Sequence, residues 1–386
     1  MPSKLFSPFT MRGLTLSNRI TVGPMCQYAA EDGVASDWHI MHLGNFALGG
    51  AGLVIAEATG VEPRGRISPL CLGLYSDACE RELRHVVDFC KRYGSAKMGV
   101  QLAHAGRKGS VSASFEPRKF LLPHEGGWRT ISSSPIDDGF HGVPEVLDTD
   151  GIARLIEDWV GATRRSERAG FDLIELHFAH GYLVNQFLSP LTNTRSDAYG
   201  GDRNRRMRLA IEIFEACRKV WPADKPMGVR ISAVDWVPGG WDMPDSVAFA
   251  AEMKARDCDY ICASSGGVSM QQKIAAGPNY QVPFAREMRA SIGIPTMAIG
   301  QITEAGQAEE ILTSGAADMI ALARRMLFNP RWAWHAAIEL GEHMVYPPRY
   351  RTCHPLMAGA LKFPESREMR EALGALASAD REKARP

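Results

Sequence analysis

The sequence predicts a (β/α)8 barrel, in which eight parallel strands alternate with eight helices. Eight short apolar runs recur along the chain, and an amphipathic segment of helical length follows each run. This regular alternation within one chain favours a closed parallel barrel over an open, doubly wound sheet. The expected strands are 20–24, 52–57, 98–103, 171–177, 227–232, 260–264, 295–300 and 318–323. The expected helices are 38–49, 79–93, 150–169, 203–220, 244–256, 281–291, 304–314 and 330–340.

Three segments lie outside this alternation. Residues 4–17 precede the first strand and are expected to form a hairpin that plugs the bottom of the barrel. Residues 104–148, rich in Gly, Ser, Pro and aromatic residues, form an insertion after the third strand, where a long loop is typical of a lid. We therefore predict one barrel domain over residues 1–360 and a charged, alanine-rich tail over 361–386 without a chemical role.

The composition excludes several classes of partner. The chain has 386 residues with 44 basic and 44 acidic side chains, so its formal net charge is zero and no nucleic-acid or membrane-surface partner is expected. Neither a signal peptide nor a run of eighteen apolar residues is present, which predicts a cytoplasmic protein. The eight cysteines are irregularly spaced, so reduced thiols are expected, without disulfides.

The stretch 170–209 carries the strongest chemical signal. A buried strand over residues 171–176 is followed within six positions by His177, His180 and Tyr182. Barrels place their chemistry where strands end and loops begin, so these three side chains are expected at an active site. A zinc site is not expected, because the motif offers no third ligand.

The other strand ends are expected at the same face of the barrel. The loops after the sixth, seventh and eighth strands carry glycines and an arginine, a combination that suits a phosphate group. The side chains and glycines concerned, in chain order, are Pro24, Met25, Cys26, Tyr28, Ala58, Gln101, Arg230, Gly266, Gly267, Gly300, Ala323 and Arg324.

Several of these stretches resemble the old yellow enzyme family of FMN-dependent oxidoreductases. The resemblance covers roughly residues 4–350 and rests on PMCQY, GVQLAHAGRK, HFAHGYLVNQFLSPLTNTRSDAYGG, VRIS, SSGG and ADMIALARR. The HxxH pair and the cysteine in the first-strand motif resemble the bacterial thermostable and xenobiotic-reductase branch. The resemblance implies bound FMN, NADPH or NADH as hydride donor, and reduction of α,β-unsaturated carbonyl or nitro compounds.

The resemblance also implies a role for each substrate-side residue. His177 and His180 would hydrogen-bond the substrate oxygen, and Tyr182 would protonate its α-carbon. Cys26 would lie near the flavin and modulate it, and Tyr28 would contact the substrate. The alternatives without a catalytic role are buried structural histidines, aromatic rings that only pack, and a small buried thiol.

On the cofactor side, Pro24, Met25, Ala58, Gln101 and Arg230 resemble flavin-contacting positions. The amide of Gln101 would bind the pyrimidine ring, and Arg230 would supply positive charge beside it. The positions that would hold the phosphate are Gly266, Gly267, Gly300, Ala323 and Arg324. Ala323 departs from the family pattern, which usually has glycine there. Arg349, Tyr350 or Arg351 would enter a neighbouring active site in a homodimer or homotetramer.

Three other functions remain as alternatives. The same fold would serve a reductase of unsaturated acyl-CoA thioesters, a reading that the arginines near residue 350 favour. A flavin-binding redox sensor would use Cys26. A phosphate-binding aldolase or isomerase barrel would need a Schiff-base lysine or a carboxylate base, and neither stands at the strand ends considered.

Overall fold

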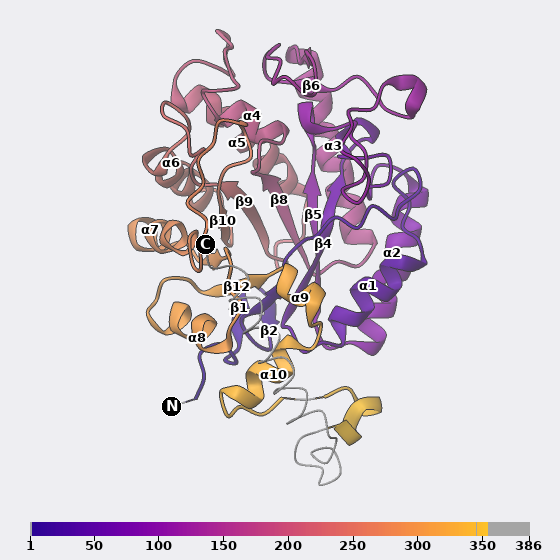
Figure 1. Ribbon diagram of the computed structural model, residues 1–386, viewed down its shortest axis with the longest axis vertical. Helices are drawn as coiled ribbons and strands as arrows, with labels where there is room; N and C mark the ends of the chain where they lie inside the picture. Colours follow the sequence, from indigo (N-terminus) through magenta and orange to yellow (C-terminus); the bar gives the residue numbers. More distant parts are fainter. Residues whose placement is uncertain (1, 345, 354–386) are drawn as a thin grey trace, which may run out of the picture. The chain divides into compact units, whose positions relative to one another are not determined.

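A closed barrel of eight parallel strands forms the centre of the protein (Figure 1). The computed structural model describes residues 2–344 and 346–353, and the residues up to His343 form one compact unit. Around the barrel, the strands follow one another in chain order, which confirms the predicted (β/α)8 architecture. The barrel strands are β3 (Ile20–Val22), β4 (Leu53–Gly60), β5 (Lys97–Ala103), β8 (Leu173–Phe178), β9 (Met227–Ser232), β10 (Ile261–Ser264), β11 (Thr296–Ala298) and β12 (Met319–Leu322).

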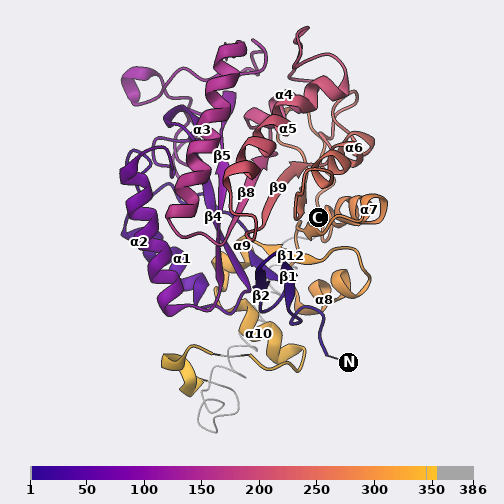
Figure 2. The same cartoon turned by 180° about the vertical axis from the view of Figure 1, so that it is seen from behind.

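Eight principal helices alternate with these strands, as predicted. Seen from behind in Figure 2, α3 and α5 lie next to each other outside the strands. The helices are α1 (Asp37–Ala47), α2 (Asp77–Tyr93), α3 (Thr149–Arg168), α5 (Arg203–Val220), α6 (Met243–Lys254), α7 (Val282–Ile292), α8 (Ala305–Thr313) and α10 (Trp332–Glu339). Two short helices that the sequence pattern did not predict, α4 (Leu183–Leu188) and α9 (Arg324–Phe328), follow β8 and β12 directly.

Side chains just before several helices fix where they begin. Asp148 accepts a hydrogen bond from the backbone N–H of Gly151 at the start of α3, and Asp202 accepts one from Arg205 at the start of α5. Such caps satisfy backbone donors that the first helical turn leaves open. Local chemistry therefore sets where the loops at the strand ends give way to helices.

The predicted N-terminal hairpin is present as β1 (Phe9–Met11) and β2 (Leu14–Leu16), paired antiparallel. Met11 and Leu16 are buried in one hydrophobic cluster with the barrel residues Leu53, Leu173 and Tyr260. The hairpin thus closes one end of the barrel, and the active-site chemistry must use the other.

The insertion after β5 also lies where the sequence predicted it. It contains only short elements: η2 (Gly106–Lys108), η3 (Pro123–Glu125), β6 (Ile131–Ser132) and β7 (Glu145–Val146). A further short helix, η1 (Pro63–Gly65), follows β4. The structure therefore places the insertion at the carboxyl-terminal side of the barrel, and its function as a lid remains a prediction.

Some boundaries differ from expectation. Ala58, expected just beyond the second barrel strand, lies within β4, which continues to Gly60 across an irregularity between Ala56 and Ala58. The tail 361–386 lies outside the described residues, and η4 (Pro348–Cys353) belongs to a second unit that begins at Met344. Among the described residues, no helix combines the length and the apolar character that crossing a membrane requires.

Candidate active site

Strand β8 delivers the two histidines of the central motif. His177 lies in the strand and is 3% exposed, while His180 lies three residues later with a φ of 62°. This left-handed turn folds the chain back on itself, so that Nε2 of His177 and Nδ1 of His180 are 3.2 Å apart. The sequence spacing therefore brings two imidazole nitrogens within hydrogen-bond distance of each other.

Both histidines are held by hydrogen bonds at their other nitrogen. The backbone N–H of Ala179 donates to Nδ1 of His177 over 3.3 Å. Nε2 of His180 lies 2.6 Å from Oγ of Ser264, the last residue of β10. Burial, together with the positive charges of Arg230 and Lys108, keeps the pKa of each imidazole well below its usual value, so both rings are neutral at pH 7.

Tyr182 packs edge-on against the same pair. Its ring centroid is 5.1 Å from that of His177, with the rings nearly perpendicular. Burial, followed by the nearby Cys26 and Tyr28, raises the pKa of the Tyr182 phenol well above its usual value. The phenol therefore stays protonated at neutral pH and is a potential proton donor.

Lys108, from the insertion, is a site residue that motif reasoning missed. Its ammonium donates to the backbone oxygens of His180 at 2.6 Å and Gly267 at 2.9 Å, and it lies 5.1 Å from the centroid of the Tyr182 ring. Burial lowers its pKa to about 8. Lys108 thus ties the turn after β8 to the loop after β10.

A cavity of about 760 Å³ extends from this cluster across the ends of β10, β11 and β12. Its lining includes His180 from the predicted substrate side and Arg230 from the predicted flavin contacts. It also includes Gly300, Ala323 and Arg324, which were predicted to hold the phosphate. The volume is within the range of cofactor sites. Lining residues outside the set of predicted site residues include Ser264, Ser265, Tyr280, Gln281 and Arg325.

At one part of this cavity, Arg230 offers an unsatisfied donor. Its Nε is buried and has no hydrogen-bond partner among the described residues. Behind it, Nε2 of Gln101 donates to the fully buried Glu175 over 2.7 Å, and the Tyr260 hydroxyl donates to the same carboxylate over 3.2 Å. A buried N–H without a hydrogen-bond partner is costly unless a bound group accepts from it.

The loops after β11 and β12 line the other part of the cavity. Gly300 has a φ of 107°, and a Cβ there would lie 3.0 Å from Gln281, so glycine is required. Ala323 has a φ of −120°, outside the left-handed region that favours glycine, so a positive φ does not require the usual glycine there.

Gly266 and Gly267 have a different surrounding from the one expected. Both have positive φ, and a Cβ on Gly267 would lie 2.5 Å from the backbone of His180. The Gly266 oxygen accepts from Ser232, whose Oγ in turn accepts from the N–H of His180. These glycines let the β10 loop approach the histidine turn, and they are not among the residues that line the cavity.

The segment after β3, residues 24–28, is half-buried. The Cys26 thiol has its pKa raised well above the usual value by a hydrogen bond with Cys71 and by burial, so it is protonated at pH 7. Tyr28 has a φ of 54° and meets Phe115 of the insertion edge-on at 6.2 Å between centroids. The insertion therefore reaches the predicted substrate side.

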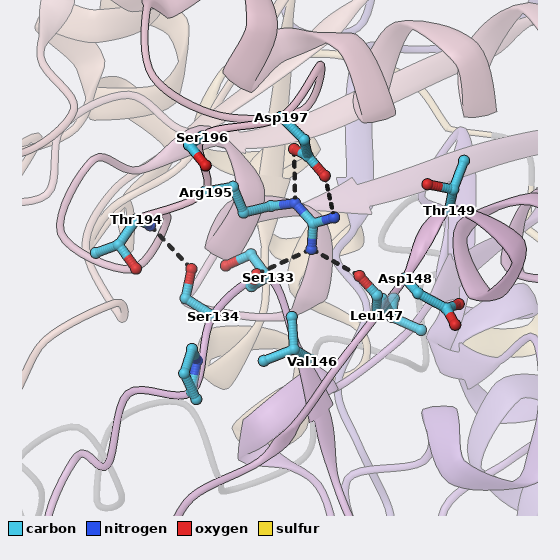
Figure 3. A pocket seen from close by; sticks show the side chains of 11 residues that line it. Ser133, Ser134, Val146, Leu147, Asp148, Thr149, Thr194, Arg195, Ser196 and Asp197 are labelled. Atoms are coloured by element: carbon cyan, nitrogen blue, oxygen red, sulfur yellow. Dashed lines mark hydrogen bonds and ion pairs between the residues drawn. The ribbon is translucent and has the colours of Figure 1, made fainter.

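Arg195, in the polar second half of the stretch 170–209, has a structural role (Figure 3). The Arg195 guanidinium donates to Asp197, to the backbone oxygen of Ser133 at 3.1 Å and to that of Leu147 at 2.6 Å. These residues line a shallow hollow of about 410 Å³, and its arginine makes four internal hydrogen bonds. Arg195 thus anchors the insertion to the loop after α4.

Comparison with known proteins identifies the family. A family model described as "NADH:flavin oxidoreductase / NADH oxidase family" matches residues 4–342. The chain belongs to this family. An NADPH dehydrogenase of Geobacillus thermodenitrificans is 43% identical over 352 residues, covering 91% of this chain and 98% of the relative. One from Geobacillus sp. strain WCH70 is 45% identical over 343 residues, covering 88% of this chain and 96% of the relative.

Solved structures agree on the fold. Morphinone reductase in complex with tetrahydroNAD is 26% identical with a TM-score of 0.72, and the similarity covers 90% of this chain and 93% of that one. A 2-naphthoyl-CoA reductase in complex with 2-naphthoyl-CoA is 21% identical with a TM-score of 0.78. The similarity covers 88% of this chain but only 52% of that chain, and at this identity it shows the fold alone.

Family membership confirms the expected enzyme class, an NAD(P)H-dependent flavin oxidoreductase of the old yellow enzyme family that uses FMN. It also excludes the aldolase or isomerase alternative. The cavity fits a flavin mononucleotide, because an unsatisfied guanidinium at Arg230 and the cationic Arg324 line one continuous space. Among the described residues, no group of three or more His, Cys, Asp or Glu side chains is arranged to hold a metal ion.

Proposed function

We propose that this flavoenzyme is an ene-reductase, which reduces the carbon–carbon double bond of α,β-unsaturated carbonyl or nitro compounds. The observation that carries the proposal is the 3.2 Å approach of Nε2 of His177 and Nδ1 of His180 beside the Tyr182 ring. Two neutral imidazoles beside a protonated phenol suit a substrate that gains negative charge on oxygen and a proton on carbon.

FMN would occupy the 760 Å³ cavity. The Arg230 guanidinium would bind the flavin edge through its spare Nε–H, and the Gln101 amide, held by Glu175, would accept a hydrogen bond from the same ring. Gly300, Ala323 and Arg324 would hold the phosphate, with Arg325 as a second cation. When bound, FMN would supply the chemistry of hydride transfer between NAD(P)H and the β-carbon of the substrate.

Pro24, Met25, Cys26 and Ala58 would complete the flavin side, and Tyr28 with Phe115 would bound the substrate. His177 and His180 would share the substrate oxygen and stabilise its developing negative charge. Tyr182 would donate its proton to the α-carbon, and its raised pKa keeps that proton in place until the carbon becomes basic. Lys108 would stabilise the resulting phenolate by its charge.

NADPH is the proposed donor, because the relatives that are more than 40% identical are named NADPH dehydrogenases. A cytoplasmic homodimer or homotetramer stays a proposal. Entry of Arg349, Tyr350 or Arg351 into a neighbouring active site also stays a proposal. These residues lie in the second unit.

Two alternatives remain. The acyl-CoA reductase is supported only by the similarity to the 2-naphthoyl-CoA reductase structure, which shows the fold and not the substrate. The redox sensor is disfavoured because a thiol with a raised pKa reacts slowly with oxidants.

The test is a visible spectrum of the purified protein followed through both half-reactions. We expect a yellow protein that bleaches under anaerobic NADPH and recovers its colour when 2-cyclohexenone is added. Bleaching without recovery would exclude the ene-reductase while leaving the flavin oxidoreductase intact.

A further inference from the structure

We propose that Glu57 is a positioning residue that holds residues 24–29, the segment between β3 and α1, and with it Cys26 and Tyr28. Glu57 lies in the middle of β4, is 3% exposed, and has no part in the mechanism above. Its hold on the segment is a property of the folded protein, whereas the consequence for FMN and substrate rests on the proposed function.

The segment 24–29 has little support of its own. It contains neither helix nor strand, and no backbone–backbone hydrogen bond of its residues is recorded in the described part of the chain. Tyr28 has a φ of 54°, a left-handed conformation that a residue other than glycine keeps only when its surroundings fix it. Side chains from other elements must therefore hold this segment.

Glu57 supplies one such contact from the barrel wall. Its Oε2 accepts a hydrogen bond from the backbone N–H of Gln27 over 3.0 Å. Gln27 stands between Cys26 and Tyr28, so this bond fixes the backbone at the centre of the predicted contact segment. A backbone N–H that loses its acceptor inside the protein is costly, and removal of the carboxylate would therefore free the segment to move.

His39 of α1 faces the other oxygen of this carboxylate. The backbone N–H of Ser36 donates to Nδ1 of His39 over 3.0 Å, so the neutral ring carries its proton on Nε2. Nε2 is buried without a hydrogen-bond partner elsewhere among the described residues, and it lies 3.4 Å from Oε1 of Glu57. The carboxylate thus meets a donor at each oxygen and bridges α1 to the segment.

The start of α1 adds two weaker contacts to the same segment. The Ser36 hydroxyl donates to the backbone oxygen of Ala29 over 2.7 Å, and the Trp38 indole N–H donates to the side-chain oxygen of Gln27 over 3.0 Å. Trp38 is 48% exposed, so water competes for its bond, whereas the Glu57 acceptor is buried. Water therefore replaces the contact with Glu57 least readily.

The first experiment is hydrogen–deuterium exchange of the FMN-loaded protein, read by mass spectrometry on peptides that cover residues 24–29. Exchange there should be about three- to tenfold faster in Glu57→Ala than in wild type, because one protecting hydrogen bond is lost. Glu57→Gln keeps the shape and one acceptor oxygen but turns the other into a donor, so its exchange rate should lie between the two. This variant carries the test if Glu57→Ala does not fold.

Glu80→Ala is the matched control. Glu80 is also a buried carboxylate, 8% exposed, but it binds Arg84 and Arg168 and does not contact the segment. Exchange at residues 24–29 should match wild type in this variant. Unchanged exchange there in both Glu57 variants, or an equal acceleration in peptides throughout the protein, would overturn the inference.

The second readout is titration with 4-hydroxybenzaldehyde, whose phenolate mimics a charged substrate oxygen, followed by the flavin absorbance. Glu57→Gln should bind this ligand about three- to tenfold more weakly than wild type, but should have no further effect in a Tyr28→Ala background. Additive losses would contradict an action through Tyr28. Faster local exchange in a protein that cannot reduce enones would leave the hold by Glu57 standing and refute only the proposed function.

Discussion

Replacing Gly267 with alanine should damage the site by displacing His180. Gly267 has a φ of 97°, where a Cβ costs about 1–2 kcal/mol. The added Cβ would also lie 2.5 Å from the backbone C, Cα and O atoms of His180, none of which belongs to a flexible side chain. Overpacking of this kind typically costs a further 1–3 kcal/mol. The expected loss of unfolding free energy is therefore about 2–5 kcal/mol.

Gly201→Ala separates the two contributions. Gly201 has a φ of 89°, but nothing lies within 4 Å of where its Cβ would be, so this variant should lose only about 1–2 kcal/mol. Urea unfolding of both FMN-saturated variants measures the difference. Titration with 4-hydroxybenzaldehyde should show weakened binding in Gly267→Ala alone. Equal stability losses together with unchanged ligand binding would refute the steric reasoning.

Three further outcomes are expected. Tyr182→Phe keeps the ring packed on His177 but removes the proton donor, so stopped-flow mixing should show reoxidation by 2-cyclohexenone slowed about 10²- to 10⁴-fold. Reduction by NADPH should stay near the wild-type rate, and equal slowing of both steps would contradict the assigned role. The double variant His177→Ala, His180→Ala should bind 4-hydroxybenzaldehyde at least about a hundredfold more weakly; an unchanged spectral titration would rule out the oxygen-binding role. Finally, burial lowers the pKa of His42 to about 4 and depresses those of His177 and His180, all below 6.5. At these three histidines the unfolded chain binds more protons in this range, so their contribution to stability is fully present above pH 6.5 and declines as the pH falls toward 4. Urea midpoints of wild type and His42→Gln at pH 7 and pH 5 measure the contribution of His42, and the same pH effect in both proteins would be the contrary result.

The sequence alone determined the barrel and the chemical motif. Strand and helix periodicity is local, and its eightfold alternation leaves few ways to bury every apolar face, so the closed sheet followed from pattern. His177, His180 and Tyr182 were found because they stand within six positions of one another at the end of one strand. The flavin, in turn, was predicted from resemblance and is borne out by the family match.

Only the tertiary structure decided which distant residues complete that motif. Lys108 reaches the His180 oxygen across 72 positions and Ser264 reaches its ring across 84, and neither stands in a pattern that marks it as a partner. Likewise, Gly267 resembled a phosphate loop in sequence but in space makes room for the histidine turn. Contacts between separate loops depend on how the barrel closes, because closure brings strand ends together whatever their separation in the chain.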